Sequence, residues 1–243
     1  MAFLQPSAPR QPIFNIPRVV VCLILALAAA HLARVWISPE QSADWIARYA
    51  FIPARYSPGF LAAAHIDPGA WWQRALPFVT YMGLHADLTH LAINSLWLLA
   101  FGPVVARRFG ALLFLVFFLV CGVAGAVTYL GFNWGSPDPV IGASGAISGL
   151  MAAAIRLLPT VNPRSLDVRE GRLLPILSRP MLLFTLVWMG MNVIAGVTGI
   201  GMGGQTALIA WQAHMGGFIA GMLLASVFDR LSPQPVGVSV DRP

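Results

Sequence analysis

Six apolar segments alternate with short polar stretches along most of this chain. They cover residues 19–38, 88–106, 111–132, 144–156, 181–200 and 207–228. A helix needs about 20 apolar residues to cross a bilayer, and every segment except the fourth approaches that length. The pattern therefore predicts an all-α membrane protein with a bundle of six transmembrane helices.

The polar stretches divide the chain into one membrane domain with two tails. Residues 1–17 and 231–243 are polar and contain prolines, so we expect flexible cytoplasmic tails around a membrane-embedded domain at 18–230. The long connection at 39–86 mixes aromatic residues with few charges, which is typical of the membrane interface. The Ala-rich end of the first segment would also suit a signal peptide. We favour a retained helix, because the charge pattern of the five later segments requires one.

The composition supports a membrane protein. The chain is 58% hydrophobic and 10% charged, whereas about a quarter of the residues in a soluble protein are charged. Its net charge of +6 comes from arginine alone, and the arginines lie between apolar segments instead of forming one basic stripe. We therefore expect the lipid bilayer, and no nucleic acid, as a partner. Cys22 and Cys121 lie inside apolar segments and are predicted to be core residues.

The distribution of arginines predicts the topology. Six spans place both termini on one side, and only Arg34, Arg48, Arg55 and Arg74 of the fifteen arginines fall on the other side. By the positive-inside rule the termini are cytoplasmic, and the start of the fourth span faces outward. We expect a multi-pass protein of the bacterial inner (plasma) membrane.

Among the polar residues within or at the ends of the apolar segments, where they are costly and usually functional, four stand out. His90 and Asn94 are four residues apart and share a helix face, Ser144 opens the fourth segment, and His214 lies in the sixth. At a rise of about 1.5 Å per residue, all four lie roughly 18–25 Å above the cytoplasmic charges. Side chains from three spans thus converge at one level below the outer surface.

Small residues indicate that the fourth and sixth spans pack closely. Gly145 and Gly149 form a small face on one span, and Gly217 and Gly221 form one on the other. Ser144 and His214 could then come within hydrogen-bonding distance, as a nucleophile and a general base. His90, Asn94 and the Ser144 amide could form an oxyanion hole.

Each of these residues also has a simpler interpretation. Ser144 could be a helix N-cap, and His214 and Asn94 could hydrogen-bond between helices. His85 and His90 could suggest zinc, but their spacing of five residues places them on different faces, and there is no HExxH motif. We expect neither a metal nor a cofactor. Without an aspartate in any span, an aspartyl protease is disfavoured, and His31 and His65 are interpreted as interfacial residues.

The ordered motifs Gly142-Ala143-Ser144-Gly145, His90-x-x-x-Asn94 and Ala213-His214 with Gly217 and Gly221 resemble the rhomboid intramembrane serine proteases. The resemblance covers roughly residues 75–230. It implies that Ser144 is the nucleophile, His214 its base, and His90, Asn94 and the Ser144 amide the oxyanion hole. It further implies cleavage of other proteins' transmembrane helices, a structural or water-positioning role for His85, and a lateral gate formed by the fifth span and the loop after it.

Two positions differ from the family's usual pattern. Many members carry an aromatic residue four positions after the serine, stacked on the catalytic histidine, and this chain has Ser148 there. The family's Trp-Arg pair in the first loop is not in register either, because Leu76-Pro77 occupies the comparable place. No acidic third member is evident, so a Ser-His dyad with slow turnover is expected.

The sequence thus favours a serine endopeptidase that acts on transmembrane protein substrates. One alternative is a non-catalytic rhomboid-like protein that binds transmembrane helices in membrane-protein quality control. The other is a small transporter, which would require broken helices in paired repeats that the sequence lacks. The sequence does not settle the oligomeric state.

Overall fold

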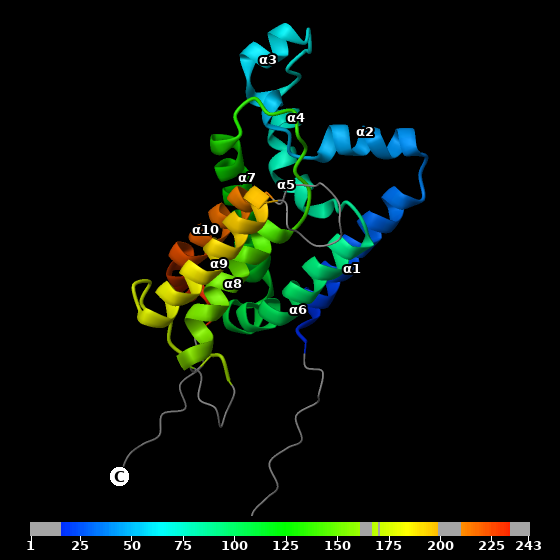
Figure 1. Cartoon of the computed structure of the whole chain (residues 1–243). Helices are drawn as coiled ribbons and strands as arrows, with labels where there is room; N and C mark the ends of the chain where they lie inside the picture. Colours follow the sequence, from blue (N-terminus) through cyan, green and yellow to red (C-terminus); the bar gives the residue numbers. More distant parts are fainter. Residues whose placement is uncertain (1–15, 161–166, 170, 199–209, 234–243) are drawn as a thin grey trace, which may run out of the picture.

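The computed structural model describes residues 16–160, 167–169, 171–198 and 210–233 (Figure 1). Apart from one isolated β-bridge between Phe51 and Val140, the regular structure in this part of the chain is helical. The predicted all-α class is therefore confirmed. Of the two predicted tails, most of each lies outside the described residues.

Each of the six apolar segments corresponds to one long helix. The helices are α1 (Arg18–Val35), α6 (Leu88–Phe109), α7 (Ala111–Phe132), α8 (Ser144–Leu157), α9 (Arg179–Thr198) and α10 (Trp211–Leu231). By length and composition α1, α6, α7 and α9 could each cross a membrane, whereas α8 is apolar but has only 14 residues. The protein is an integral membrane protein with several membrane-length helices.

Helix α8 lies at the centre of the bundle. Every residue from Gly145 to Ala154 is buried, as expected for a helix that is apolar on all sides. Helices α6, α7 and α10 pack around it, α1 packs on the outer side of α6, and α9 packs against α10 (Figure 1). The outer surfaces of α1 and α9 are rich in exposed leucine, isoleucine and valine, as required for contact with lipid.

The connection between α1 and α6 forms a layer of short helices at one end of the bundle (upper part of Figure 1). Its elements are α2 (Pro39–Tyr49), η1 (Pro53–Tyr56), α3 (Pro58–Ala63), α4 (Trp71–Ala75), α5 (Pro77–Thr80) and η2 (Tyr81–Gly83). Trp71 and Trp72 are exposed, but Phe51 and Tyr81 are fully buried. The aromatic residues here thus serve packing as well as the predicted interface.

Local signals in the sequence account for several helix ends. Ser38 caps α2 by accepting a hydrogen bond from the Gln41 amide, while the Gln41 side chain accepts one from the Ser38 amide. Asp87 caps α6 in the same way by accepting from the His90 amide at 2.8 Å. At the other end of α6, Gly110 has φ +79°, the left-handed conformation that glycine adopts at low cost. The Asp87 cap and Gly110 fix the two ends of α6, and so fix where His90 and Asn94 lie along that helix.

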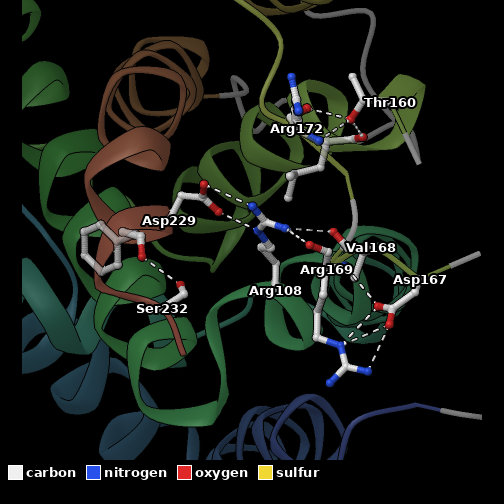
Figure 2. Close-up of polar contacts among 10 residues, drawn as sticks. Arg108, Thr160, Asp167, Val168, Arg169, Arg172, Asp229 and Ser232 are labelled. Atoms are coloured by element: carbon white, nitrogen blue, oxygen red, sulfur yellow. Dashed lines mark hydrogen bonds and ion pairs between the residues drawn. The ribbon is translucent and has the colours of Figure 1, made fainter. Parts of the chain in front are cut away.

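The opposite end of the bundle is held by arginines (Figure 2). Arg108 forms a bidentate ion pair with Asp229, at 2.5 Å and 3.1 Å, and also donates to the carbonyl groups of Val168 and Arg169. Arg156 is buried and donates to the carbonyls of Leu174 and Met222. These contacts tie α6, α8, α10 and the segment before α9 together.

One prediction about burial was wrong. Cys121 is buried, but Cys22 is exposed, because it lies on the apolar outer surface of α1. His65 is exposed, as expected of an interfacial residue, whereas His31 is only 4% exposed. His31 is one turn from the end of α1 and is buried within the protein.

Candidate active site

Ser144 is the first residue of α8, where the chain turns from an extended loop into the helix. The loop is fixed by the bridge between Val140 and Phe51 and by the Gly142 amide, which donates to the Tyr81 carbonyl at 2.9 Å. Gly142 has φ +117°, a conformation that disfavours any side chain. The first amides of α8 have no carbonyl one turn earlier, so they point outward from the helix start as free donors.

His214 lies in the first turn of α10 and faces Ser144. Its Nε2 atom is 2.7 Å from the Ser144 Oγ atom, a good hydrogen-bonding distance. Both residues are partly exposed. The two predicted partners, 70 residues apart in sequence, are therefore in direct contact.

Glycines allow this contact because they bring α8 and α10 together. A Cβ atom at Gly217 would collide with the Gly145 carbonyl, and one at Gly221 would collide with the Gly149 carbonyl. A Cβ atom at Gly149 would lie 2.5 Å from the Cβ atom of Cys121 on α7. The four glycines that the sequence pattern singled out thus lie where the helix backbones meet.

His90 and Asn94 lie beside the loop that carries Ser144. A Cβ atom placed on Gly142 would be 2.7 Å from His90 Nε2 and 3.6 Å from Asn94 Nδ2. Asn94 is 2% exposed, and its Nδ2 atom has no hydrogen-bond partner among the residues that the structure describes. An unsatisfied buried amide donor is costly unless a ligand or water completes it. The space beside Gly142 therefore suits a negatively charged oxygen.

His85 lies behind His90, and its ring centroid is 5.1 Å from the His90 centroid. The ring is fully buried. Burial, assisted by the proximity of His90, lowers the pKa of His85 to about 3, so that the ring is neutral at physiological pH. Arg34 on α1 holds this loop by donating to the His85 carbonyl at 2.6 Å.

Asn192 on α9 completes the contacts of His214, and the sequence analysis did not identify it. Its Oδ1 atom is 2.6 Å from His214 Nδ1, and its Nδ2 atom donates to the Trp188 carbonyl at 2.8 Å. Asn192 is 7% exposed. The sequence signal that could have identified Asn192 is a polar residue inside an apolar span, because such residues are costly and usually functional. The third position beside the histidine thus carries a neutral amide instead of a carboxylate.

The described residues contain no group of three or more His, Cys, Asp or Glu side chains close enough to hold a metal ion. The site contains a serine, a histidine that contacts it, and several hydrogen-bond donors around one small space. That combination is the arrangement used for acyl transfer.

Comparison with known proteins identifies the family. The rhomboid domain matches residues 68–230, which include α6 to α9, nearly all of α10, and Ser144, His214, His90, Asn94 and Asn192. The chain belongs to the rhomboid family. This assignment confirms the six-transmembrane-helix rhomboid fold and the resemblance drawn from the sequence motifs.

Several curated rhomboid proteins are similar to this chain. It is 32% identical over 162 residues to the rhomboid protease GluP of Bacillus subtilis, a match that covers 66% of this chain and 27% of GluP. It is 25% identical to RHOMBOID-like protein 4 of Arabidopsis thaliana, over 87% of this chain and 52% of the relative. It is 28% identical to the mitochondrial RHOMBOID-like protein 6 of the same plant, over 76% and 57%. This chain therefore matches 27% to 57% of the length of these three relatives.

Proposed function

We propose that this rhomboid is an intramembrane serine endopeptidase that cleaves transmembrane segments of other membrane proteins. The observation that carries the proposal is the 2.7 Å contact between Ser144 Oγ and His214 Nε2. A serine becomes an effective nucleophile when an adjacent base accepts its proton. Family membership and the similarity to GluP, a rhomboid protease, support the same conclusion.

The proposed reaction follows from these positions. Ser144 Oγ attacks the scissile carbonyl carbon while His214 Nε2 takes its proton, and His214 then gives the proton to the leaving amine. Water, deprotonated by His214, hydrolyses the acyl-enzyme. Asn94 Nδ2, His90 Nε2 and the Ser144 amide stabilise the oxyanion of each tetrahedral intermediate, a role that suits the unpartnered Asn94 amide.

The proposed orientation places the site near the outer face of the membrane. The Ser144 end of α8 lies at one end of the bundle, and Arg108 of α6 and Arg156 of α8 lie at the opposite end. An excess of arginine marks the cytoplasmic side. Both termini are then cytoplasmic, and substrates are cleaved near the outer ends of their helices. A substrate that lies within the bilayer is also consistent with the exposed apolar surfaces of α1 and α9.

Labelling with a fluorophosphonate probe tests the proposal without a known substrate. The parent protein in mild detergent is compared with Ser144→Ala and His214→Ala, and an active rhomboid serves as a positive control. We expect the parent alone to be labelled, because the probe reacts with a serine only when a base activates it. Thermal unfolding of the three proteins should be similar, since neither side chain is fully buried.

Equal labelling of all three proteins would mean that another nucleophile reacts and would reject the site. An unlabelled parent, with the control labelled, would favour a non-catalytic rhomboid that binds transmembrane helices. With a cleavable substrate in hand, full activity of Ser144→Ala would overturn the mechanism.

A further inference from the structure

We propose that Asn192 is a positioning residue that holds His214 in the tautomer able to accept the Ser144 proton. This inference rests on the proposed serine protease function and adds a third residue to it. The carrying observation is the 2.6 Å contact between Asn192 Oδ1 and His214 Nδ1. A short contact of this kind fixes both the orientation and the protonation pattern of an imidazole ring.

The direction of the Asn192 amide follows from its second contact. Its Nδ2 group donates to the Trp188 carbonyl, 2.8 Å away and one turn earlier in α9. The oxygen is then left to face His214, and because an amide oxygen only accepts, His214 Nδ1 must carry the hydrogen. Nε2 is consequently unprotonated in the neutral ring and can accept a hydrogen bond from Ser144 Oγ.

The usual aromatic support for the histidine is absent at the position where many family members carry it. That position is Ser148, which is 2% exposed, and its hydroxyl donates to the Ser144 carbonyl at 2.8 Å. Ser148 is thus engaged within its own helix. Asn192, from a different helix, provides a contact that orients the ring without placing a charge in the bilayer.

Because Asn192 lies on α9, the orientation of His214 depends on where α9 sits. Among the residues that the structure describes, only Met181, Asn192 and Gly196 of α9 are buried. The ring of Phe184 stacks on Phe218 of α10 at 6.1 Å, and a Cβ atom at Gly196 would collide with the Trp211 ring. The histidine is therefore correctly oriented only while α9 is docked against α10.

The first test measures the rate of fluorophosphonate labelling from pH 5 to pH 9 in the parent, Asn192→Ala and Asn192→Asp. Thr185→Val is the matched control, since it removes a buried hydroxyl without a hydrogen-bond partner from the same helix. We expect Asn192→Ala to label about 3- to 10-fold more slowly at pH 7, the factor that one neutral hydrogen bond supports. Thr185→Val should stay within about twofold of the parent.

The pH profile separates positioning from packing. The Asn192 oxygen also stabilises protonated His214, so its loss should move the acid limb of the Asn192→Ala profile to lower pH. A carboxylate stabilises the imidazolium more strongly, so Asn192→Asp should regain the rate above the acid limb and move that limb to higher pH. His90, the titratable neighbour of His214 on α6, is present in all these proteins and does not contribute to the differences.

The second test needs no activity. Histidine-selective 15N labelling reports the tautomer of each ring by NMR, and the His214→Gln variant identifies the signal of His214. We expect the Nδ1–H form in the parent and in Thr185→Val, and a mixture of tautomers in Asn192→Ala.

The outcomes separate this inference from the proposed function. An unlabelled parent would reject the protease, but the NMR result would still decide whether Asn192 fixes the tautomer. Parental labelling and an unchanged tautomer in Asn192→Ala would reject the positioning role while leaving the protease intact. Equal rate losses in Asn192→Ala and Asn192→Asp, with unmoved acid limbs, would show that Asn192 only packs, which also overturns the proposal.

Discussion

Asn94 is a buried side chain that we propose contributes to the reaction and not to the fold. Its Nδ2 atom has no partner among the described residues, so the amide is available to the proposed oxyanion. Replacing Asn94 with alanine should slow fluorophosphonate labelling about 100-fold, the typical effect of losing one oxyanion-hole donor. Binding of a transmembrane substrate should change little, because the donor acts mainly in the transition state.

Asn133→Ala provides the matched control for Asn94→Ala. Asn133 is also an asparagine near a helix end, but its side chain donates to the Tyr129 carbonyl of its own helix at 3.0 Å. We expect Asn133→Ala to label at the parental rate. A comparable loss in both variants, or a large fall in the melting temperature of Asn94→Ala, would mean that Asn94 holds the fold instead.

At the residue scale, the sequence predicted the pairs that helical spacing can reveal. His90 and Asn94 are one turn apart on α6. Counting residues from the arginine-rich end predicts that Ser144 and His214 lie at the same depth in the membrane, and the two side chains are in contact. Asn192 could not be found in this way. It sits on α9, a helix whose rotation the sequence does not determine, and a lone amide in a span is equally consistent with helix packing. The buried His31 was missed for the same reason.

At the scale of elements, the contact between α8 and α10 depends on backbones that touch. A Cβ atom at Gly221 would lie 2.5 Å from Gly149 Cα and 2.7 Å from the Gly149 carbonyl carbon, and neither can move without shifting a helix. Gly221→Ala should therefore destabilise the protein by about 1–3 kcal/mol, a typical cost of overpacking. We expect a lower melting temperature in detergent and slower labelling of Ser144.

Gly131→Ala tests whether the effect is specific to that contact. Gly131 lies in α7, and a Cβ atom there has nothing within 4 Å. Alanine favours a helix over glycine by about 0.5–1 kcal/mol, so this variant should be as stable as the parent or slightly more so. If Gly221→Ala melted at the parental temperature, the close approach of α8 and α10 would not be needed for stability.

Prediction of the elements succeeded where one local pattern decides the outcome. The bounds of α7 match the apolar segment at 111–132, because Gly110 and the end of the apolar run mark them in the sequence. The connection at 39–86 was recognised only as interfacial. Its short helices are held by distant partners, such as the bridge of Phe51 to Val140 and the hydrogen bond from the Tyr56 hydroxyl to the Arg74 carbonyl. Burial at that site raises the pKa of Tyr56 to about 12.

At the scale of the whole molecule, the proposed catalytic residues and the anchoring polar contacts lie at opposite ends of the same helices. Ser144 and His214 are in the first turns of α8 and α10, whereas Arg156 and Asp229 are in their last turns. A helix of 14 residues, the length of α8, spans about 21 Å. At the anchored end, Arg156 donates to the Met222 carbonyl and the Ser226 hydroxyl of α10. The close contact of α8 and α10 at the Ser144 end is thus supported by polar contacts at the other end.

This separation makes a prediction for the ion pair between Arg108 and Asp229 (Figure 2). The two side chains are 11% and 19% exposed, so removing either one deprives a mostly buried charge of this ion pair. Asp229→Ala and Arg108→Ala should each lower stability by about 1–3 kcal/mol. The double variant should lose clearly less than the sum of the two, because both single changes break the same contact.

Thermal unfolding of the four proteins, with Arg230→Ala as the exposed neighbouring control, measures this coupling. Below the melting temperature, the rate of Ser144 labelling should stay within about twofold of the parent in every variant, because surviving folded molecules keep the distant site intact. Strictly additive losses would mean that Arg108 acts through the carbonyls of Val168 and Arg169 instead of through Asp229. A loss of labelling without a loss of stability would show that the Arg108 end affects Ser144 directly, contrary to the proposed division of roles between the two ends.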